Sequence, residues 1–160
     1  MKSDNIVIRK LSIKDIPNVI SISKRIFGVT DNENWHHAAV TKWEDRFNKN
    51  GALLGAYVNG LLVGYKFGYE KSPERFHSWM GGVLREYRGQ KIATHLLKHQ
   101  ENLIKEKGYK EITVNTIESK YPIMLKFLKK HGYVVDSVSE QKEFDNSVVL
   151  KSHLKKKLKI

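Results

Sequence analysis

The sequence has no cysteine among its 160 residues. This absence excludes disulfide bonds, thiolate metal sites and a cysteine nucleophile. The histidines have no ligand-like spacing apart from the neighbours His36 and His37, which would point apart on a helix, so we expect no metal site. No apolar run approaches the roughly 20 residues that span a bilayer, and the start Met1-Lys2-Ser3-Asp4 is too polar for a secretory signal. We therefore expect a cytoplasmic protein with no membrane partner.

Acidic residues are few beside basic ones, 17 against 29, which gives a formal net charge of +12. This excess suits an anionic partner, either a phosphate-bearing small molecule or a nucleic acid or acidic surface. Much of it lies in a run near the end of the chain, at Lys151, Lys155, Lys156, Lys157 and Lys159, which we interpret as a solvated end. The length and the 40% hydrophobic content predict one globular domain, residues 3–160.

The first half of the chain predicts a strand, two helices and a hairpin. Residues 5–10 alternate as a strand, and an apolar stripe from residue 16 predicts a helix that ends at Gly28. Aromatic residues spaced by four predict a second helix from Trp35 to Phe47. Asn59-Gly60 then predicts a tight turn between strands 52–58 and 61–70, because both central residues of a type I′ turn need positive φ.

A further strand, residues 76–83, contains the pair Gly81-Gly82, which predicts a bulge or the close approach of another group. After Val83 the chain changes to a helix whose start carries Gly89 and the charge of Arg88. Helix starts leave about four backbone N–H groups unpaired and carry partial positive charge. This strand-to-helix junction therefore predicts an anion-binding site.

Residues 83–97 resemble the acyl-CoA signature of the GNAT superfamily of N-acyltransferases, Q/R-x-x-G-x-G/A after a strand. Arg88, Gly89, Ile92 and Ala93 fit the pattern, whereas Lys91 stands where the family usually has glycine. We expect Lys91 to expose its N–H group in the first turn of the helix.

The resemblance continues after a strand at residues 111–116. A helix from Tyr121-Pro122 matches the family pattern A-x-x-L/F-Y-x-x-x-G-F through Met124, Phe127, Gly132 and Tyr133, with Met124, Phe127 and Leu128 expected to face inward. Leu128 replaces the tyrosine from which related enzymes donate a proton to the leaving thiolate. Closing strands are expected at residues 133–138 and 148–154.

The resemblance implies a single-domain α+β fold with a mixed, mostly antiparallel sheet of six to seven strands flanked by about four helices. It implies transfer of an acetyl group from acetyl-CoA, as co-substrate and without a metal, to a primary amine by direct attack in a ternary complex. The residues expected to bind acetyl-CoA lie at the junction, in the strand after it and in the last helix: Val83, Arg88, Gly89, Gln90, Lys91, Ile92, Ala93, Thr94, Asn115 and Phe127.

Two residues are candidates for the general base. Glu70 is a carboxylate close to the expected site, and His77 has a suitable intrinsic pKa and lies on strand 76–83 itself. Each also has a purely structural interpretation, as a solvent-facing strand end and as a hydrogen-bonded sheet histidine. The second helix borders the acceptor site in the family, so Trp35, His36 or His37 could shape a pocket instead of packing in the core.

Two other functions stay open. A nucleic-acid-binding protein would need exposed aromatic residues interleaved with basic ones, and the row Tyr65, Phe67 and Tyr69 is apolar enough to be core. The second alternative is a domain that binds coenzyme A but does not catalyse transfer. It stays open because Leu128 stands in place of the tyrosine that acts as an acid in related enzymes. We expect a small-molecule or peptide amine as acceptor and no nucleic-acid partner, and the formation of a homodimer stays open.

Overall fold

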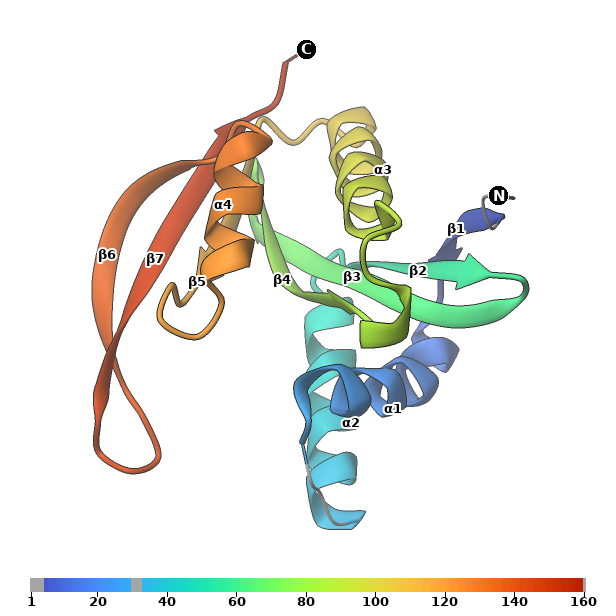
Figure 1. The fold of residues 1–160 in the computed structure, drawn as a ribbon. Helices are drawn as coiled ribbons and strands as arrows, with labels where there is room; N and C mark the ends of the chain where they lie inside the picture. Colours follow the sequence, from blue (N-terminus) through green and yellow to red (C-terminus); the bar gives the residue numbers. More distant parts are fainter. Residues whose placement is uncertain (1–4, 30–32, 160) are drawn as a thin grey trace.

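The computed structural model describes residues 5–29 and 33–159. Its elements follow one another along the chain as shown in Figure 1. They are β1 (Ile6–Leu11), α1 (Ile16–Phe27), α2 (Glu33–Phe47), β2 (Ala52–Val58), β3 (Leu61–Ser72), β4 (Arg75–Val83), α3 (Ile92–Glu106), β5 (Glu111–Thr116), α4 (Pro122–Lys130), β6 (Val134–Lys142) and β7 (Val148–Lys157). No helix in this described part of the chain is both long and apolar enough to cross a membrane.

The strands form one seven-stranded sheet in the order β1-β2-β3-β4-β5-β7-β6. Every neighbouring pair is antiparallel except β4 and β5, which are parallel and joined through α3. The predicted fold class is confirmed, with seven strands and four α-helices in the described residues. The parallel pair is the irregular part of an otherwise antiparallel sheet.

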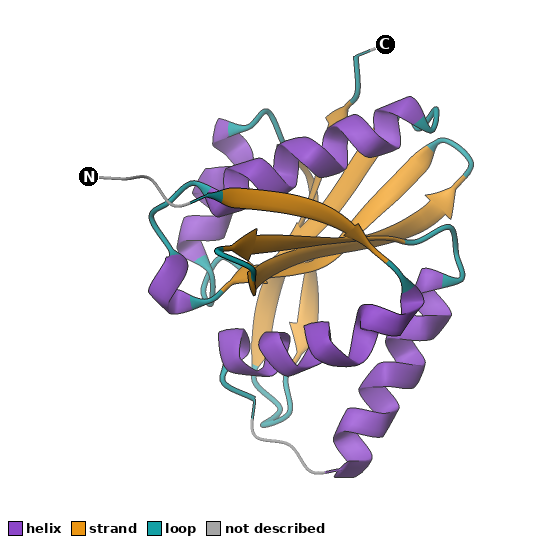
Figure 2. Cartoon of the chain, turned by 90° about the vertical axis from the view of Figure 1, so that its right-hand side faces the viewer, coloured by secondary structure: helices purple, strands orange, loops and turns teal. Residues whose placement is uncertain are grey.

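Helices cover both faces of the sheet (Figure 2). On the face that we call the α1/α2 face, Ile16, Val19 and Trp43 pack against Tyr65 and Phe67. On the α3/α4 face, apolar side chains of α3 and α4 pack against β2, β4, β5 and β7. The aromatic row of β3 is therefore core on the α1/α2 face, since Tyr65 and Phe67 are almost fully buried.

The predicted hairpin is confirmed, because Asn59 and Gly60 join β2 to β3 with φ values of 50° and 82°. Gly28 ends α1 with φ 65°, also as expected. In α4 one prediction is wrong: Leu125 and Leu128 are buried, whereas Met124 is 37% exposed. Which residues of α4 face inward depends on the rotation of the helix about its axis. The spacing of apolar residues in the sequence did not define this rotation.

The end of the chain forms a longer hairpin than the sequence predicts. Strand β6 continues to Lys142 and is exposed along almost its whole length, as expected for an edge strand that no helix covers. The apolar side chains Val134, Val138 and Leu150 of this hairpin are more than half exposed. Strands β6 and β7 extend away from the rest of the sheet in Figure 1.

Candidate active site

Strands β4 and β5 separate after a short paired stretch. Their register runs from Arg75 with Glu111 to Ser78 with Val114, and beyond this pair no described strand adjoins β4 on its β5 side. We call this point the fork. Figure 1 shows the two strands running apart below it, with α3 and α4 over the two sides. Backbone groups of β4 beyond Ser78 are therefore available on that side for a ligand.

A β-bulge in β4 begins at the fork. Ser78 pairs with Gly68 and Met80 pairs with Phe67, so Trp79 is the extra residue. Both Trp79 and Met80 pack against the core of the α1/α2 face. The bulge was expected at Gly81-Gly82, and that position is wrong. Those glycines remain paired with Lys66 and Tyr65.

Gly82 serves the other purpose that the sequence suggested, a close approach. A Cβ atom built on Gly82 would lie 2.8 Å from Cγ2 of Ile26, so a side chain there would displace the Ile26 side chain of α1. Gly82 is therefore explained by the packing of α1 on β4. The bulge itself contains no glycine, because its extra residue is Trp79.

The start of α3 is open to an anion. The first N–H group that bonds back along the helix is that of His95, to the carbonyl oxygen of Lys91 at 3.1 Å. No side chain caps the helix and its first turn holds no acidic residue. The N–H groups of Ile92, Ala93 and Thr94 are therefore left for water or a ligand. Nε of Arg88 donates to the carbonyl oxygen of Val83 at 3.2 Å, which fixes its guanidinium beside this helix start.

Lys91 does not lie in the first helical turn, so that prediction is wrong. It precedes the helix with φ 63° and ψ 20°, in the left-handed region. A residue with a Cβ atom loses roughly 1–2 kcal/mol in this conformation, whereas glycine does not. The backbone conformation thus accounts for the glycine in the family pattern. Gly89 also has a positive φ, 84°, which glycine adopts without strain.

The surroundings of Gly89 fit a phosphate-bearing ligand such as coenzyme A. A Cβ atom built on Gly89 meets no atom within 4 Å, so space remains beside the backbone there. Gln90 and Thr94 are half-buried in the same loop and first turn, and Ala93 is exposed. The partial positive charge of the helix start and the charges of Arg88 and Lys91 favour an anion at this place.

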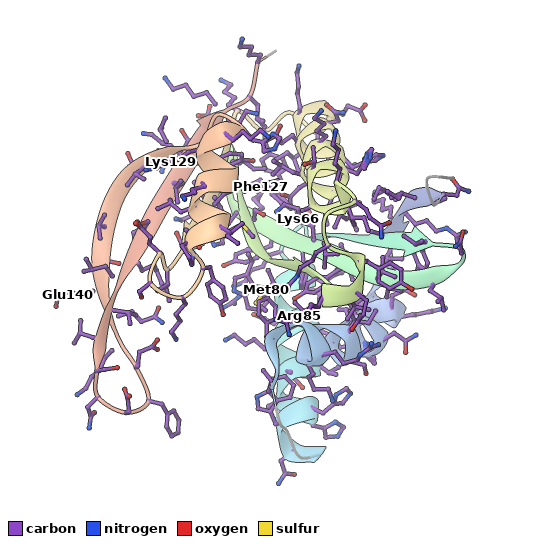
Figure 3. All side chains as sticks on the ribbon, in the orientation of Figure 1. Lys66, Met80, Arg85, Phe127, Lys129 and Glu140 are labelled. Carbon is purple, nitrogen blue, oxygen red and sulfur yellow. The ribbon has the colours of Figure 1, made fainter. Side chains whose placement is uncertain are left out.

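Phe127 comes to this region from α4. Its ring is half-buried and lies 4.6 Å from the His131 ring, centroid to centroid. Figure 3 shows Phe127 and Lys66 in the region between α4 and α3. Phe127 therefore lies between α3 and α4, on the same face of the sheet as the start of α3.

Asn115 is the exception among the predicted cofactor residues. Its neighbours Val114 and Thr116 are buried, whereas Asn115 is exposed on the α1/α2 face, and its Oδ1 lies 2.8 Å from Nδ1 of His153. It therefore points away from the side of the sheet where α3 begins. Because side chains alternate along a strand, the sequence predicts that Asn115 lies on the opposite face from Val114 and Thr116. It does not predict which of the two faces α3 covers.

Glu70 lies on the α3/α4 face and already has a partner. The hydroxyl group of Tyr109 donates to its Oε1 at 2.8 Å. Burial, with Glu70 acting in the same direction, raises the pKa of Tyr109 to about 12. Glu70 pairs with Phe76 in the sheet, before the fork, where β4 and β5 are still joined.

His77 is on the opposite face, immediately before the fork. It is 7% exposed, and its Nδ1 forms a 2.8 Å hydrogen bond with Oγ1 of Thr113. Burial lowers its pKa to about 4, and the positive charge of Lys71 adds to this effect. His77 is therefore neutral near pH 7 and a weak base.

A hollow of about 180 Å³ opens on the same face, next to Thr113 and Asn115. Its remaining lining is mostly charged or polar: Lys71, Arg75, Glu111, Asp136, Ser137, His153, Leu154 and Lys155. Ion pairs join Arg75 to Glu111 at 3.3 Å and Lys155 to Asp136 at 3.0 Å. Sequence reasoning missed this hollow, because its residues come from five strands whose pairing only the fold reveals.

In the described residues no cluster of three His, Asp or Glu side chains could hold a metal ion.

The tyrosines near α4 differ in environment. Leu128, at the position of the family tyrosine, is 1% exposed within the core. The hydroxyl group of Tyr133 donates to Oε2 of Glu101 at 2.7 Å, and burial raises its pKa strongly. Tyr121 is 45% exposed at the start of α4, with its ring edge-on to Phe27 at 6.3 Å.

A sheet that forks between its parallel strands, with a bulge at the fork and an uncapped helix start beside it, is the architecture of acyl-CoA-dependent acetyltransferases. The model of the family described as Acetyltransferase (GNAT) family matches residues 16–133, and the chain belongs to this family. A comparison with curated proteins gives no match.

Solved structures share the whole fold at low sequence identity. The ribosomal-protein-S18-alanine N-acetyltransferase from Escherichia coli is 11% identical, with a TM-score of 0.80 over 98% of this chain and 96% of that one. Ard1 from Thermoplasma volcanium is 18% identical, with a TM-score of 0.78 over 97% and 99%. PaiA N-acetyltransferase from Thermoplasma acidophilum, solved in complex with coenzyme A, is 21% identical, with a TM-score of 0.69 over 96% and 99%.

Proposed function

We propose that the protein transfers an acetyl group from acetyl-CoA to a primary amine by direct attack in a ternary complex. The observation that carries this proposal is the coincidence of the fork with the bulge at Trp79, beside the uncapped start of α3. The pyrophosphate would lie over the N–H groups of residues 88–94, and the thioester would reach the unpaired edge of β4. The coenzyme A in the structure of the PaiA relative supports this choice of co-substrate.

The chemistry needs few side chains. A primary amine with a pKa near 10.4 costs roughly 4–5 kcal/mol to deprotonate at pH 7, so a proton acceptor is required. Backbone N–H groups at the bulge would stabilise the negative charge that develops on the thioester oxygen. The leaving thiolate, with a pKa near 8.5, needs little help from an acid.

The acceptor would approach from the α1/α2 face, where the hollow beside Thr113 and Asn115 adjoins the fork. Between the two candidate bases, His77 is better placed than Glu70. Its neutral ring lies on this face, hydrogen-bonded to Thr113. Glu70 lies on the other face and accepts the Tyr109 hydroxyl group. Because the pKa of His77 is low, its role would be to relay the proton to water and not to retain it.

A screen of amine acceptors with acetyl-CoA, followed by release of free thiol, tests the proposal. Thiol release that requires both acetyl-CoA and an amine, with the acetylated amine identified by mass, would support it. Coenzyme A binding without turnover on amino acids, polyamines, amino sugars or peptide N-termini would instead indicate a binding domain.

A further inference from the structure

Lys66 is a primary amine on the α3/α4 face next to the fork. It lies in the middle of β3 and pairs with Gly81, which belongs to the stretch of β4 beyond the fork. A Cβ atom built on Gly81 would lie 3.5 Å from Cγ of Lys66. The lysine stem therefore lies beside the place that a side chain of Gly81 would occupy, on the β3 side of β4. Figure 3 shows Lys66 between α3 and α4.

The ammonium group of Lys66 has no direct partner. It makes no hydrogen bond or ion pair with any other residue that the structure describes. The side-chain amide of Gln100, on the buried side of α3, likewise lacks partners in the described residues and is fully buried. The charged group near Lys66 is the carboxylate of Glu101, which is already bonded to Tyr133 and Lys156.

The protonation of Lys66 differs from that of a surface lysine. Burial lowers its pKa to about 8, although the carboxylate of Glu101 acts in the opposite direction. At pH 7 about one molecule in ten therefore carries the neutral amine, against less than about one in a thousand for an ordinary lysine. A neutral amine is the form that can act as a nucleophile.

We propose that Lys66 is a self-acetylation site, modified by the acetyl-CoA that the protein binds at the fork. The Lys66 Nζ attacks the thioester carbonyl carbon, a C–N bond forms and the C–S bond breaks. Coenzyme A leaves as the thiolate, and the proton lost from the amine passes to it through water. This inference rests on the proposed function, because it uses the same co-substrate at the same place.

The modification would act on the protein itself. Acetyl-Lys66 carries no charge and places an amide beside the stretch of β4 that the thioester has to reach. A self-acetylated protein is therefore expected to turn over more slowly than the unmodified protein. Slow accumulation in the absence of an acceptor is expected, since an amine acceptor competes for the same acetyl group.

Lys107 provides a matched control within the chain. It follows the last turn of α3, at the opposite end of the helix from the anion-binding start, and burial and the charge of Lys10 lower its pKa. Acetylation that depends only on a low pKa would modify Lys107 as well as Lys66. Acetylation by bound acetyl-CoA would select Lys66.

The test is to incubate the protein with acetyl-CoA alone, follow intact mass and locate the acetyl group by peptide mapping. Binding of coenzyme A is measured in parallel by calorimetry. We expect one added acetyl group at Lys66, at a rate that saturates with acetyl-CoA. It should be lost in Lys66→Arg, retained in Lys107→Arg, and at least about tenfold slower in Gly89→Val.

Binding of coenzyme A without any acetylation of Lys66 would overturn self-acetylation and leave the proposed function standing. Modification of Lys107 and surface lysines at rates similar to that of Lys66, linear in acetyl-CoA, would also overturn it. Absence of coenzyme A binding would contradict both the inference and the proposed function.

Discussion

Ser78 and Val114 form the last pair between β4 and β5, and the bulge in β4 begins at the very next residue, Trp79. Two irregularities of the sheet thus meet at one point. The parallel ladder ends there, and the bulge turns two successive side chains, Trp79 and Met80, to the α1/α2 face. The end of the ladder leaves the β5-side edge of β4 without a neighbouring strand in the described residues, while β3 stays paired on the other side. A sheet gains nothing in stability from this arrangement, which is consistent with a functional site.

The first prediction concerns the left-handed residue before α3. Lys91→Gly removes the strain of φ 63° but lets the unfolded chain gain entropy. We expect a free energy of unfolding that is unchanged or higher by up to about 1 kcal/mol. The exposed Lys98, in the middle of the same helix, is the control, because Lys98→Gly should cost about 1 kcal/mol. Equal destabilisation in both variants, measured by urea unfolding, would contradict the assigned conformation.

At the start of α3 the sequence predicted the kind of site but not the residue at which the helix begins. Arg88 and Gly89 predicted the anion-binding junction, and the structure places an uncapped helix start there. The sequence did not predict that the helix begins only at Ile92, because lysine is a common helix residue and no side-chain cap marks the boundary. The unusual conformation at Lys91 is imposed by the path of the chain between β4 and α3, which composition cannot reveal.

The second prediction concerns His77 and pH. Its folded-state pKa of about 4 lies below the unfolded value of 6.5, so protonation favours the unfolded chain. The stability that depends on neutral His77 is fully present above pH 6.5 and is lost as the pH falls towards 4. The slope of unfolding free energy against pH should exceed that of His77→Gln by at most about 1.4 kcal/mol per pH unit in this window.

The control for this measurement is His37, an exposed histidine of α2. His37→Gln should keep the wild-type slope between pH 4 and 6.5, measured by denaturant unfolding at each pH. A His77→Gln slope equal to that of wild type would show that His77 does not become protonated on unfolding, contrary to its buried place beside Thr113.

The third prediction concerns the order of events in catalysis. With no cysteine to hold the acetyl group, transfer should be direct from thioester to amine. Initial-rate plots at several fixed acceptor concentrations should intersect. Parallel lines, together with an acetyl-enzyme that passes its acetyl group to the acceptor, would rule out direct attack. Acetyl-Lys66 would not meet this criterion, because an amide does not pass on its acetyl group.

The fourth prediction concerns the missing tyrosine. Leu128→Tyr would place a hydroxyl group in a core position that is 1% exposed, so we expect a loss of about 1–3 kcal/mol in stability. Any gain in rate should stay below about 10²-fold. Tyr121→Phe should retain turnover, since the thiolate leaves without an acid. If Tyr121→Phe or Tyr133→Phe abolished turnover while coenzyme A affinity held, catalysis without a tyrosine acid would be wrong.

The acceptor side of the site was the part that sequence reasoning could not assemble. Glu70 and His77 were ranked together because both lie near the fork in sequence. The sheet separates them: Glu70 pairs with Phe76, so His77, the next residue of β4, lies on the opposite face. Asn115, which was assigned to the cofactor, lies on the opposite face from the start of α3. Which face each residue takes depends on pairings between strands far apart in the chain.

Coenzyme A affinity of Gly89→Val, measured by calorimetry, tests whether acyl-CoA binds at the start of α3. Gly89 and Gly108 both have positive φ, 84° and 95°, and a Cβ atom built on either meets nothing within 4 Å. Valine therefore introduces similar backbone strain at the two positions, which thermal unfolding can verify. We expect Gly89→Val to weaken coenzyme A binding at least about tenfold, whereas Gly108→Val should bind like wild type. Equal affinity in the two folded variants would contradict an acyl-CoA site at the start of α3.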